Sequence, residues 1–370
     1  MGSNMIGAPV EWRRAVVLAG MLAFCVAGSA GAGPIPTAQI FLGDFNGQQV
    51  VRWSGNTPDT FVSSFGVGTF VEGMGGYSVG SGVNKVNHVL VGAGANILDY
   101  IVNFPTGQSL AHTIANAGFT LQMTVANDGN SFYAAQGGNG ISQFSIVPGN
   151  YGTRLNQTAV KGPGGASADV WGVAVNPANG DVIASANWAG PGEGVHVGIN
   201  EYDSSLHFIK FLVPYGDHGL THGAGITFAP DGSFYVVQGG NAVPLSPDAF
   251  VLHYAADGTY LDTLTAPAGF LNHAFQPAIG PDGNLYVSNQ AGNCVVRFNT
   301  TTQTFMDVFI SASATAGNGE ESAKTIFFTT NTIAQTAAEP ASILMALSGS
   351  AVLLGGCALR RREKSPSVPT

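Results

Sequence analysis

The chain has 370 residues, of which 45% are hydrophobic and only 9% are charged, whereas ordinary soluble domains carry roughly a quarter charged residues. Between residues 33 and 338, seven Lys and Arg stand against nineteen Asp and Glu, which leaves a net charge of −12. A surface this acidic repels phosphate backbones, which argues against nucleic acid as a partner but is compatible with a cation or a neutral glycan.

The N-terminus has the order of a secretory signal. Two arginines precede the apolar run 15–26, and small residues follow it up to Ala32. A charged start, a short apolar stretch and an Ala-x-Ala site define such signals, and Ala-Gly-Ala at 30–32 supplies that site. We expect signal peptidase to remove residues 1–32 by cutting after Ala32, with a cut after Ala30 as the alternative. The apolar run is too short to favour an uncleaved membrane helix.

From residue 38 to residue 331 the sequence repeats a turn and the strands around it. The turn ends in a glycine that returns after 51, 52 and 51 residues, at Gly129, Gly180, Gly232 and Gly283. Asp-Gly and Asn-Gly between apolar runs are hairpin turns. We therefore expect one strand before and one after each turn, in these pairs: 121–125 and 132–134, 172–175 and 182–184, 226–229 and 234–237, 277–280 and 285–287.

A third strand has its own signature, a β-branched residue, two variable positions and an aromatic residue. It occurs six times, with the aromatic residue at these positions: Trp53, Tyr100, Phe144, Tyr202, Tyr254 and Phe298. Side chains three apart on a strand face opposite ways, so each can pack against a different neighbouring unit. Six copies of a four-stranded antiparallel unit of about 50 residues predict an all-β fold, a six-bladed β-propeller. Seven blades are the alternative, if 161–167 hides a divergent set of strands.

The two ends of the repeat predict how the ring closes. The first copy begins at Ile40 with its second strand, and an unassigned strand at 323–328 follows the last copy. Pairing this strand with the first blade would remove two exposed edges.

The repeats resemble the NHL and gluconolactonase-like six-bladed propellers. Blades of those families share an apolar strand, Pro-Asp-Gly, Leu-Tyr-Val and Val-x-x-Tyr/Phe, and Pro-Asp-Gly-Asn-Leu-Tyr-Val at 281–287 is the best match here. The resemblance covers roughly residues 38–331 and implies the architecture, which carries enzymes, binders and scaffolds alike.

Ligands of propellers bind where the loops that enter the innermost strands converge. When the blades are aligned on the turn glycines, His222 and His273 share one blade position, and Asp169 takes it in the preceding blade. Two imidazoles and a carboxylate on one rim predict a divalent-metal site, and resemblance to NHL-like lyases implies zinc. Resemblance to gluconolactonases implies calcium instead, with Glu72, Asn127 and Asp169 as candidates. The alternative is that both histidines only hydrogen-bond neighbouring loops.

The C-terminus carries a second predicted targeting signal. A linker at 332–342 precedes seventeen apolar or small residues at 343–359. As a transmembrane helix they would span about 25 Å, a little short of a ~30 Å bilayer core. The basic tail 360–370 follows, and its arginines should stay cytoplasmic with the propeller outside. The residues that define this segment are Glu339 and Pro340 before the helix and Arg360, Arg361 and Arg362 after it.

These C-terminal residues resemble the PEP-CTERM sorting domain of exosortase-processed bacterial proteins, although Ala338 stands where that family has its first proline. The resemblance implies an exosortase-type enzyme that cuts near the Glu-Pro motif, and a plain uncut membrane anchor is the alternative. We therefore expect an exported protein, anchored in the membrane by the C-terminal helix and then placed at the cell surface or in the extracellular matrix.

The function predicted from these features is a non-enzymatic binding platform. PEP-CTERM proteins are associated with exopolysaccharide-producing bacteria, so the resemblance implies an extracellular polysaccharide or protein as the ligand. The chain has no phosphate loop, Cys-x-x-Cys pair or His-Glu-x-x-His motif. The alternative is an exported metal-dependent lyase or lactonase that acts through Asp169, His222 and His273, with zinc or calcium as cofactor.

Overall fold

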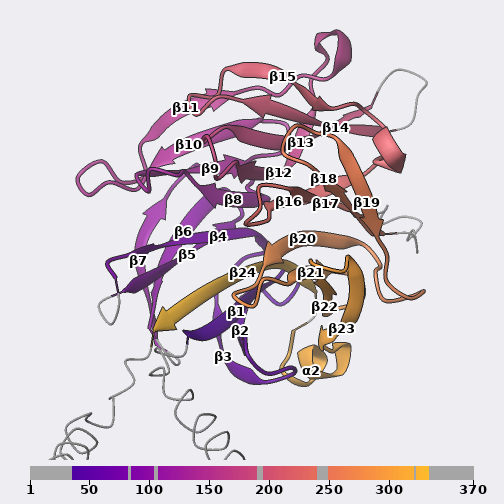
Figure 1. Cartoon of the computed structure of the whole chain (residues 1–370). Coiled ribbons are helices and arrows are strands. Elements are labelled where there is room, and N and C mark those ends of the chain that lie inside the picture. Colours follow the sequence, from indigo (N-terminus) through magenta and orange to yellow (C-terminus); the bar gives the residue numbers. More distant parts are fainter. Residues whose placement is uncertain are drawn as a thin grey trace, which may run out of the picture. The chain divides into compact units, whose positions relative to one another are not determined.

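Six four-stranded sheets surround a common centre in the computed structural model, which describes residues 36–332 except 82–84, 104–106, 190–194, 240–248 and 321 (Figure 1). Each sheet is one blade of an all-β propeller. Its strands, innermost first, have these bounds: blade 1, β24 (Ala323–Thr332), β1 (Pro36–Asp44), β2 (Gln49–Ser54), β3 (Phe61–Gly66); blade 2, β4 (Val71–Val79), β5 (Val86–Ala93), β6 (Asn96–Val102), β7 (Gln108–Ile114); blade 3, β8 (Gln122–Val125), β9 (Ser131–Ala135), β10 (Ile141–Ser145), β11 (Arg154–Thr158); blade 4, β12 (Asp169–Val175), β13 (Val182–Ala189), β14 (Val195–Tyr202), β15 (Phe208–Val213); blade 5, β16 (Gly223–Phe228), β17 (Phe234–Gln238), β18 (Phe250–Tyr254), β19 (Tyr260–Leu264); blade 6, β20 (Ala274–Ile279), β21 (Leu285–Asn289), β22 (Cys294–Asn299), β23 (Thr304–Ile310).

The repeated turn joins the first two strands of blades 3 to 6, as the sequence predicts. Its glycines, Gly129, Gly180, Gly232 and Gly283, have φ between 67° and 88°, a region that glycine enters without strain. The strands on either side pair antiparallel, for example Ile279 with Leu285 across the turn of blade 6.

The ring closes as predicted, because β24 takes the innermost place in blade 1, next to β1 (Figure 1). Ile326 of this strand packs in one cluster with Ile40 and Trp53. The described residues between β11 and β12 hold a single bridge, Lys161 to Ser167, around a short 3-10 turn. The seven-blade alternative is therefore wrong.

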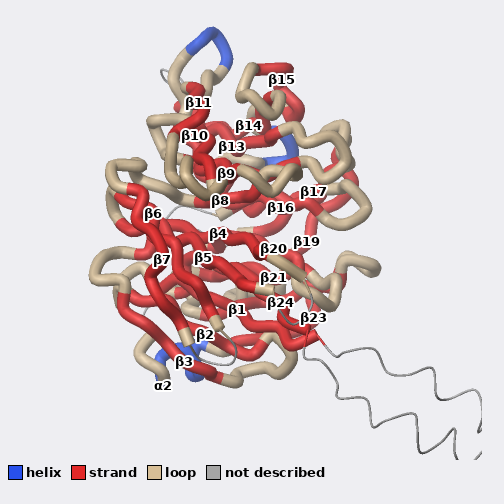
Figure 2. Tube along the Cα trace, turned by 90° about the vertical axis from the view of Figure 1, so that its left-hand side faces the viewer, coloured by secondary structure: helices blue, strands red, loops and turns tan. Residues whose placement is uncertain are grey.

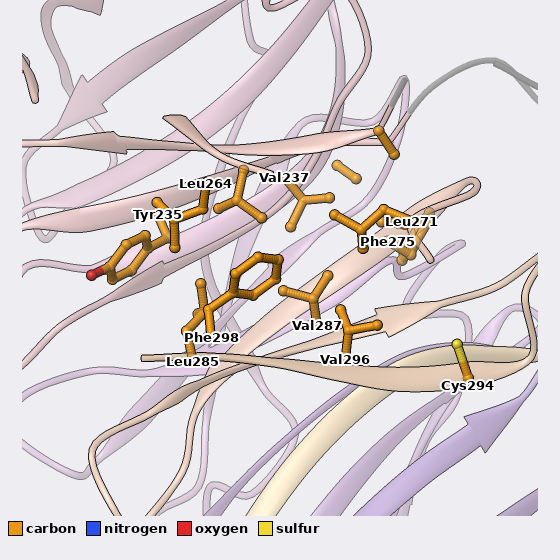
Figure 3. Packing of buried hydrophobic residues seen from close by; sticks show 14 of the residues in the cluster. Tyr235, Val237, Leu264, Leu271, Phe275, Leu285, Val287, Cys294, Val296 and Phe298 are labelled. Carbon is orange, nitrogen blue, oxygen red and sulfur yellow. The ribbon is translucent and has the colours of Figure 1, made fainter. Parts of the chain in front are cut away.

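The hydrophobic core lies between neighbouring blades, and the third-strand signature explains why. Val295 packs in a cluster with Ile40 and Trp53 of blade 1, whereas Phe298, three residues on, packs with Val251 of blade 5. Figure 3 shows this second cluster, with side chains of blades 5 and 6 meeting between their sheets. Each such buried side chain contributes about 1.5–3 kcal/mol relative to its exposed state.

Inner strands approach one another closely around the centre. A Cβ added to Gly172 of β12 would lie 2.4 Å from the carbonyl oxygen of Ala224 in β16, so only glycine allows this spacing. Two glutamine side chains then bridge blades that are not neighbours. The amide Nε2 of Gln122 donates to the carbonyl of Ile226 at 2.7 Å, and that of Gln276 donates to the carbonyl of Met74 at 3.3 Å.

A short α-helix, α2 (Ala312–Gly317), lies between β23 and β24 in the chain (Figure 2). Ser311 caps it by accepting a hydrogen bond from the backbone N–H of Ala314, and the backbone N–H of Ser311 donates to Asp59 in the β2–β3 turn at 2.6 Å. The helix therefore fastens the last blade to the first.

The predicted signal segment 1–32, the sorting linker 332–342 beyond Thr332, the apolar segment 343–359 and the tail 360–370 lie outside the described residues. Among the helices that are described, none is long and apolar enough to cross a bilayer. Secretion, sorting and anchoring therefore stay predictions from the sequence.

Candidate functional site at the channel mouth

All inner strands start at the same end of the propeller, which forms one mouth of the central channel. The first residues of these strands, or those just before them, include Glu72, Asp169, His222, His273 and Lys324. A cavity of about 410 Å³ opens here, within the range of roughly 300–1,000 Å³ that is usual for small-molecule sites.

The structure brings the three predicted site residues to this mouth. Asp169 and His273 line the same cavity. His222 lies just before β16 and is not among the residues that line this cavity. Its backbone N–H donates to the side-chain oxygen of Gln238 at 2.9 Å, and its Nδ1 lies 3.3 Å from the hydroxyl of Thr221. The alignment on turn glycines therefore placed all three at one end of the ring.

Both imidazoles favour their neutral form. Burial lowers the pKa of His222. Burial also lowers the pKa of His273, and the positive charge of Lys324 and the neighbouring His222 lower it further. At neutral pH each ring can therefore donate one hydrogen bond and accept another.

These three residues do not form a metal-ligand set as they stand. In the part of the chain that the structure describes, no group of three or more His, Cys, Asp or Glu side chains is placed to hold a metal ion. Zinc or calcium bound by His222, His273 and Asp169 therefore stays a prediction.

The second calcium set, Glu72, Asn127 and Asp169, is wrong. Asn127 lies in the turn between β8 and β9, at the opposite ends of the inner strands, and its Nδ2 donates to the carbonyl of Asn176 at 2.9 Å. Glu72 and Asp169 instead lie where β4 and β12 begin. A hairpin asparagine cannot reach the mouth.

The mouth also contains a buried ion pair that the sequence did not predict. The ammonium Nζ of Lys324 lies 2.7 Å from Oε2 of Glu72, and their side chains are only 8% and 5% exposed. The same Nζ lies 4.3 Å from the ring centre of Phe45 and 4.9 Å from that of Phe275, which adds cation–π attraction. Burial lowers the pKa of Lys324, and Glu72 opposes this shift.

Two features of the sequence could have pointed to this pair. Lys324 is one of only seven basic residues between 33 and 338, and it lies in the strand predicted to close the ring. A lysine on a closing strand next to the channel needs a carboxylate partner if it is buried. Only the ring geometry shows that the partner is Glu72, 252 residues away.

Aromatic side chains give the mouth an amphipathic character. Trp171 is half-buried and lies 6.1 Å from Phe275 between ring centres, with the rings inclined by 31°. Phe119 lines the same cavity and is 45% exposed. Asp169, His273 and the amide of Gln290 add hydrogen-bonding groups around these rings. The mouth can therefore hold a ligand that has both an apolar face and polar edges.

Comparison with known proteins gives a likeness of fold. No protein-family model matches the chain, and no curated protein matches it. Similar solved structures include one in a nidogen/laminin complex, with 12% identity over 80% of this chain and 99% of that chain and a TM-score of 0.53. The chain is a six-bladed β-propeller.

Two further solved structures are similar to this propeller. A functionally unknown protein from Desulfotomaculum acetoxidans has 12% identity, covers 78% of this chain and 98% of its own, and has a TM-score of 0.52. A putative 6-phosphogluconolactonase from Bacteroides uniformis has 13% identity, covers 79% of this chain and 99% of its own, and has a TM-score of 0.51. At such identities the likeness shows the fold alone, because one fold hosts many functions.

Proposed function

We propose that this propeller is an exported, non-enzymatic binding protein of the cell surface or extracellular matrix, and that a neutral polysaccharide binds at its channel mouth. The observation that carries the proposal is the amphipathic cavity, where Trp171 and Phe119 lie beside Asp169, His273 and Gln290. Export and sorting rest on the terminal sequence signals described above.

The chemistry of a sugar ring suits this cavity. The C–H face of a pyranose packs on an aromatic ring, and its hydroxyl groups need donors and acceptors when they leave water. Neutral His273 can act as either, Asp169 accepts and the amide of Gln290 does both.

The charge of the protein favours a neutral ligand over an acidic one. The ammonium group in the cavity lining, that of Lys324, is already paired with Glu72. An acidic polysaccharide would therefore meet a negatively charged protein without a free cation to receive it in this lining.

Binding of oligosaccharides to the purified full chain, measured by isothermal titration calorimetry, tests the proposal. Trp171→Ala should weaken binding of a neutral oligosaccharide about tenfold, because it removes the stacking surface. Leu261→Ala is the matched control, since Leu261 is 47% exposed on the outer strand β19. Equal affinity of wild type and Trp171→Ala would contradict binding at the mouth.

The alternative function is a metal-dependent lyase or lactonase. It is favoured by the presence of His222, His273 and Asp169 at one mouth, where two neutral imidazoles and a carboxylate could hold zinc or calcium. A bound metal would polarise a carbonyl or activate water there. Metal analysis decides between the two functions. Stoichiometric metal that is lost in His273→Ala, together with metal-dependent turnover of a lactone or glycan, would replace the binding proposal.

A further inference from the structure

A larger groove lies at the other end of the inner strands, on the seam between blades 2 and 3. Its walls are the end of β4 from Tyr77 to Gly80, His88 of β5, His112 of β7 and the turn after β10 from Ile146 to Tyr151. The volume is about 770 Å³. Because β4 begins at Val71 near the mouth and ends at Val79 in the groove, the two cavities open at opposite ends of the inner strands.

A buried carboxylate holds the groove's polar side chains in place. Asp99 is fully buried and accepts hydrogen bonds from the hydroxyl groups of Tyr77 at 3.0 Å and Tyr151 at 2.6 Å. Nδ1 of His88 lies 2.9 Å from the same carboxylate. A carboxylate only accepts, so Nδ1 of His88 donates, and Nε2 is the ring atom left for a ligand. Since Tyr151 belongs to blade 3, this network also joins the two blades.

Two stacked ring pairs rest on that network. Tyr77 lies flat on His88 with 4.3 Å between ring centres, and His112 lies on Tyr151 with 4.0 Å. Burial and then the Asp99 carboxylate raise the pKa of both tyrosines, so their hydroxyl groups remain protonated donors. Hydrogen bonds to Asp99 therefore orient Tyr77, His88 and Tyr151 before a ligand arrives, which reduces the entropy cost of binding.

The Asp99–His88 pair is not part of a hydrolase triad. Gly-Tyr-Ser-Val-Gly at 76–80 has the spacing that carries the nucleophile in some hydrolases. Here Ser78 lies within strand β4, and its hydroxyl donates to Oδ1 of Asn87 at 2.8 Å. Neighbours on a strand point to opposite faces, so Ser78 faces away from Tyr77 and from the His88 ring stacked on it. This arrangement supports binding over covalent catalysis.

The groove lining indicates the chemistry of its ligand. The described lining residues include no Lys, Arg, Asp or Glu, and Val79 and Val147 expose 54% and 40% of their surface at its edge. Flat rings, exposed apolar groups, two imidazoles and the absence of Lys, Arg, Asp and Glu in this described lining suit a neutral ring that carries hydroxyl groups.

We propose that this groove is a second binding site for neutral sugar rings, so that one propeller can bridge two stretches of polysaccharide, one at the channel mouth and one in the groove. The groove itself is independent of the mouth, whereas the bridging rests on the proposed function. Two sites per chain would raise the avidity for a long polymer without any new contact.

Calorimetry on the full chain tests this inference with cellotetraose and maltotetraose as probes. Wild type should bind two tetrasaccharides per chain, and His112→Ala should bind one, with groove affinity at least about tenfold weaker. His112 is exposed, so its replacement should not impair folding. Val147→Asp, which brings a charge into the groove, should give the same loss. Thr113→Ala is the matched control, because this exposed neighbour on β7 is not part of the groove lining.

The outcomes separate the two proposals. One site that Trp171→Ala removes and both groove variants leave intact would overturn the groove site and support the mouth. One site lost in both groove variants but kept in Trp171→Ala would support the groove site and overturn the mouth and the bridging. A peptide containing tryptophan that binds the groove when neither sugar does would overturn the sugar assignment.

Discussion

The two cavities at opposite ends of the inner strands are built in different ways. The mouth draws one or two residues from the same position of several blades, such as Asp169, His222 and His273. The groove depends on Tyr77, His88 and Tyr151, which all hydrogen-bond to Asp99, and on His112, which stacks on Tyr151. The repeat therefore places the mouth residues around a ring, whereas side-chain contacts between blades 2 and 3 build the groove.

The mouth and the groove also differ in how they treat buried charge. At the mouth, Lys324 and Glu72 neutralise each other, whereas in the groove Asp99 is held by hydroxyl groups and an imidazole. Variants of these residues distinguish a buried charge that is stabilised by an ion pair from one that is stabilised by neutral hydrogen-bond donors.

The largest expected effect comes from breaking the ion pair. Lys324→Met leaves Glu72 buried without a partner and should lower the free energy of unfolding by about 3–5 kcal/mol. The double variant Lys324→Met with Glu72→Leu should regain most of this loss, because no uncompensated charge remains buried. Urea denaturation of wild type, Lys324→Met, Glu72→Leu and the double variant measures these differences in the free energy of unfolding. A single variant as stable as wild type would show that the pair is not buried as described.

A second buried carboxyl, just after α2, predicts how stability depends on pH. Glu320, just before β24, is 1% exposed, and burial followed by the charge of Asp44 raises its pKa to about 8. Because the folded pKa exceeds the unfolded value of about 4.5, its contribution is complete below that value and disappears as pH rises through 8.

Urea denaturation between pH 5 and pH 9 should therefore show a loss of up to a few kcal/mol at the alkaline end. Glu320→Gln should flatten this part of the profile, since the amide does not titrate. A profile that is the same in both proteins would rule out Glu320 as its cause.

The smallest expected effect is in the groove. Asp99→Asn keeps the size of the side chain but cannot accept from Tyr77, Tyr151 and His88 as well as a carboxylate does. This substitution should lower the free energy of unfolding by about 2 kcal/mol, which is typical for the loss of hydrogen bonds to a charged group. Sugar binding at the groove should weaken as the rings lose their support, with no change at the mouth. The control is Asp257→Asn, whose carboxylate is exposed in the turn between β18 and β19.

Local patterns predicted the blades because each depends on a few neighbouring residues. Turn glycines, alternating strands and the branched and aromatic pair of the third strand act within one blade, and Val295 and Phe298 show the result by facing different neighbours. Closure by 323–328 also followed, because an unpaired strand at each end of the repeat has one way to remove both edges.

Only the tertiary structure determined which side chains contact one another across the ring. Glu72 and Lys324 are 252 residues apart, and Tyr151 reaches Asp99 from another blade, so no spacing in the sequence reports either contact. The prediction that Asn127 lies at the mouth was wrong for the same reason, because the direction of β8 determines at which end of the inner strands this residue lies. Local chemistry determines which strands form, but the closed ring determines which side chains can touch.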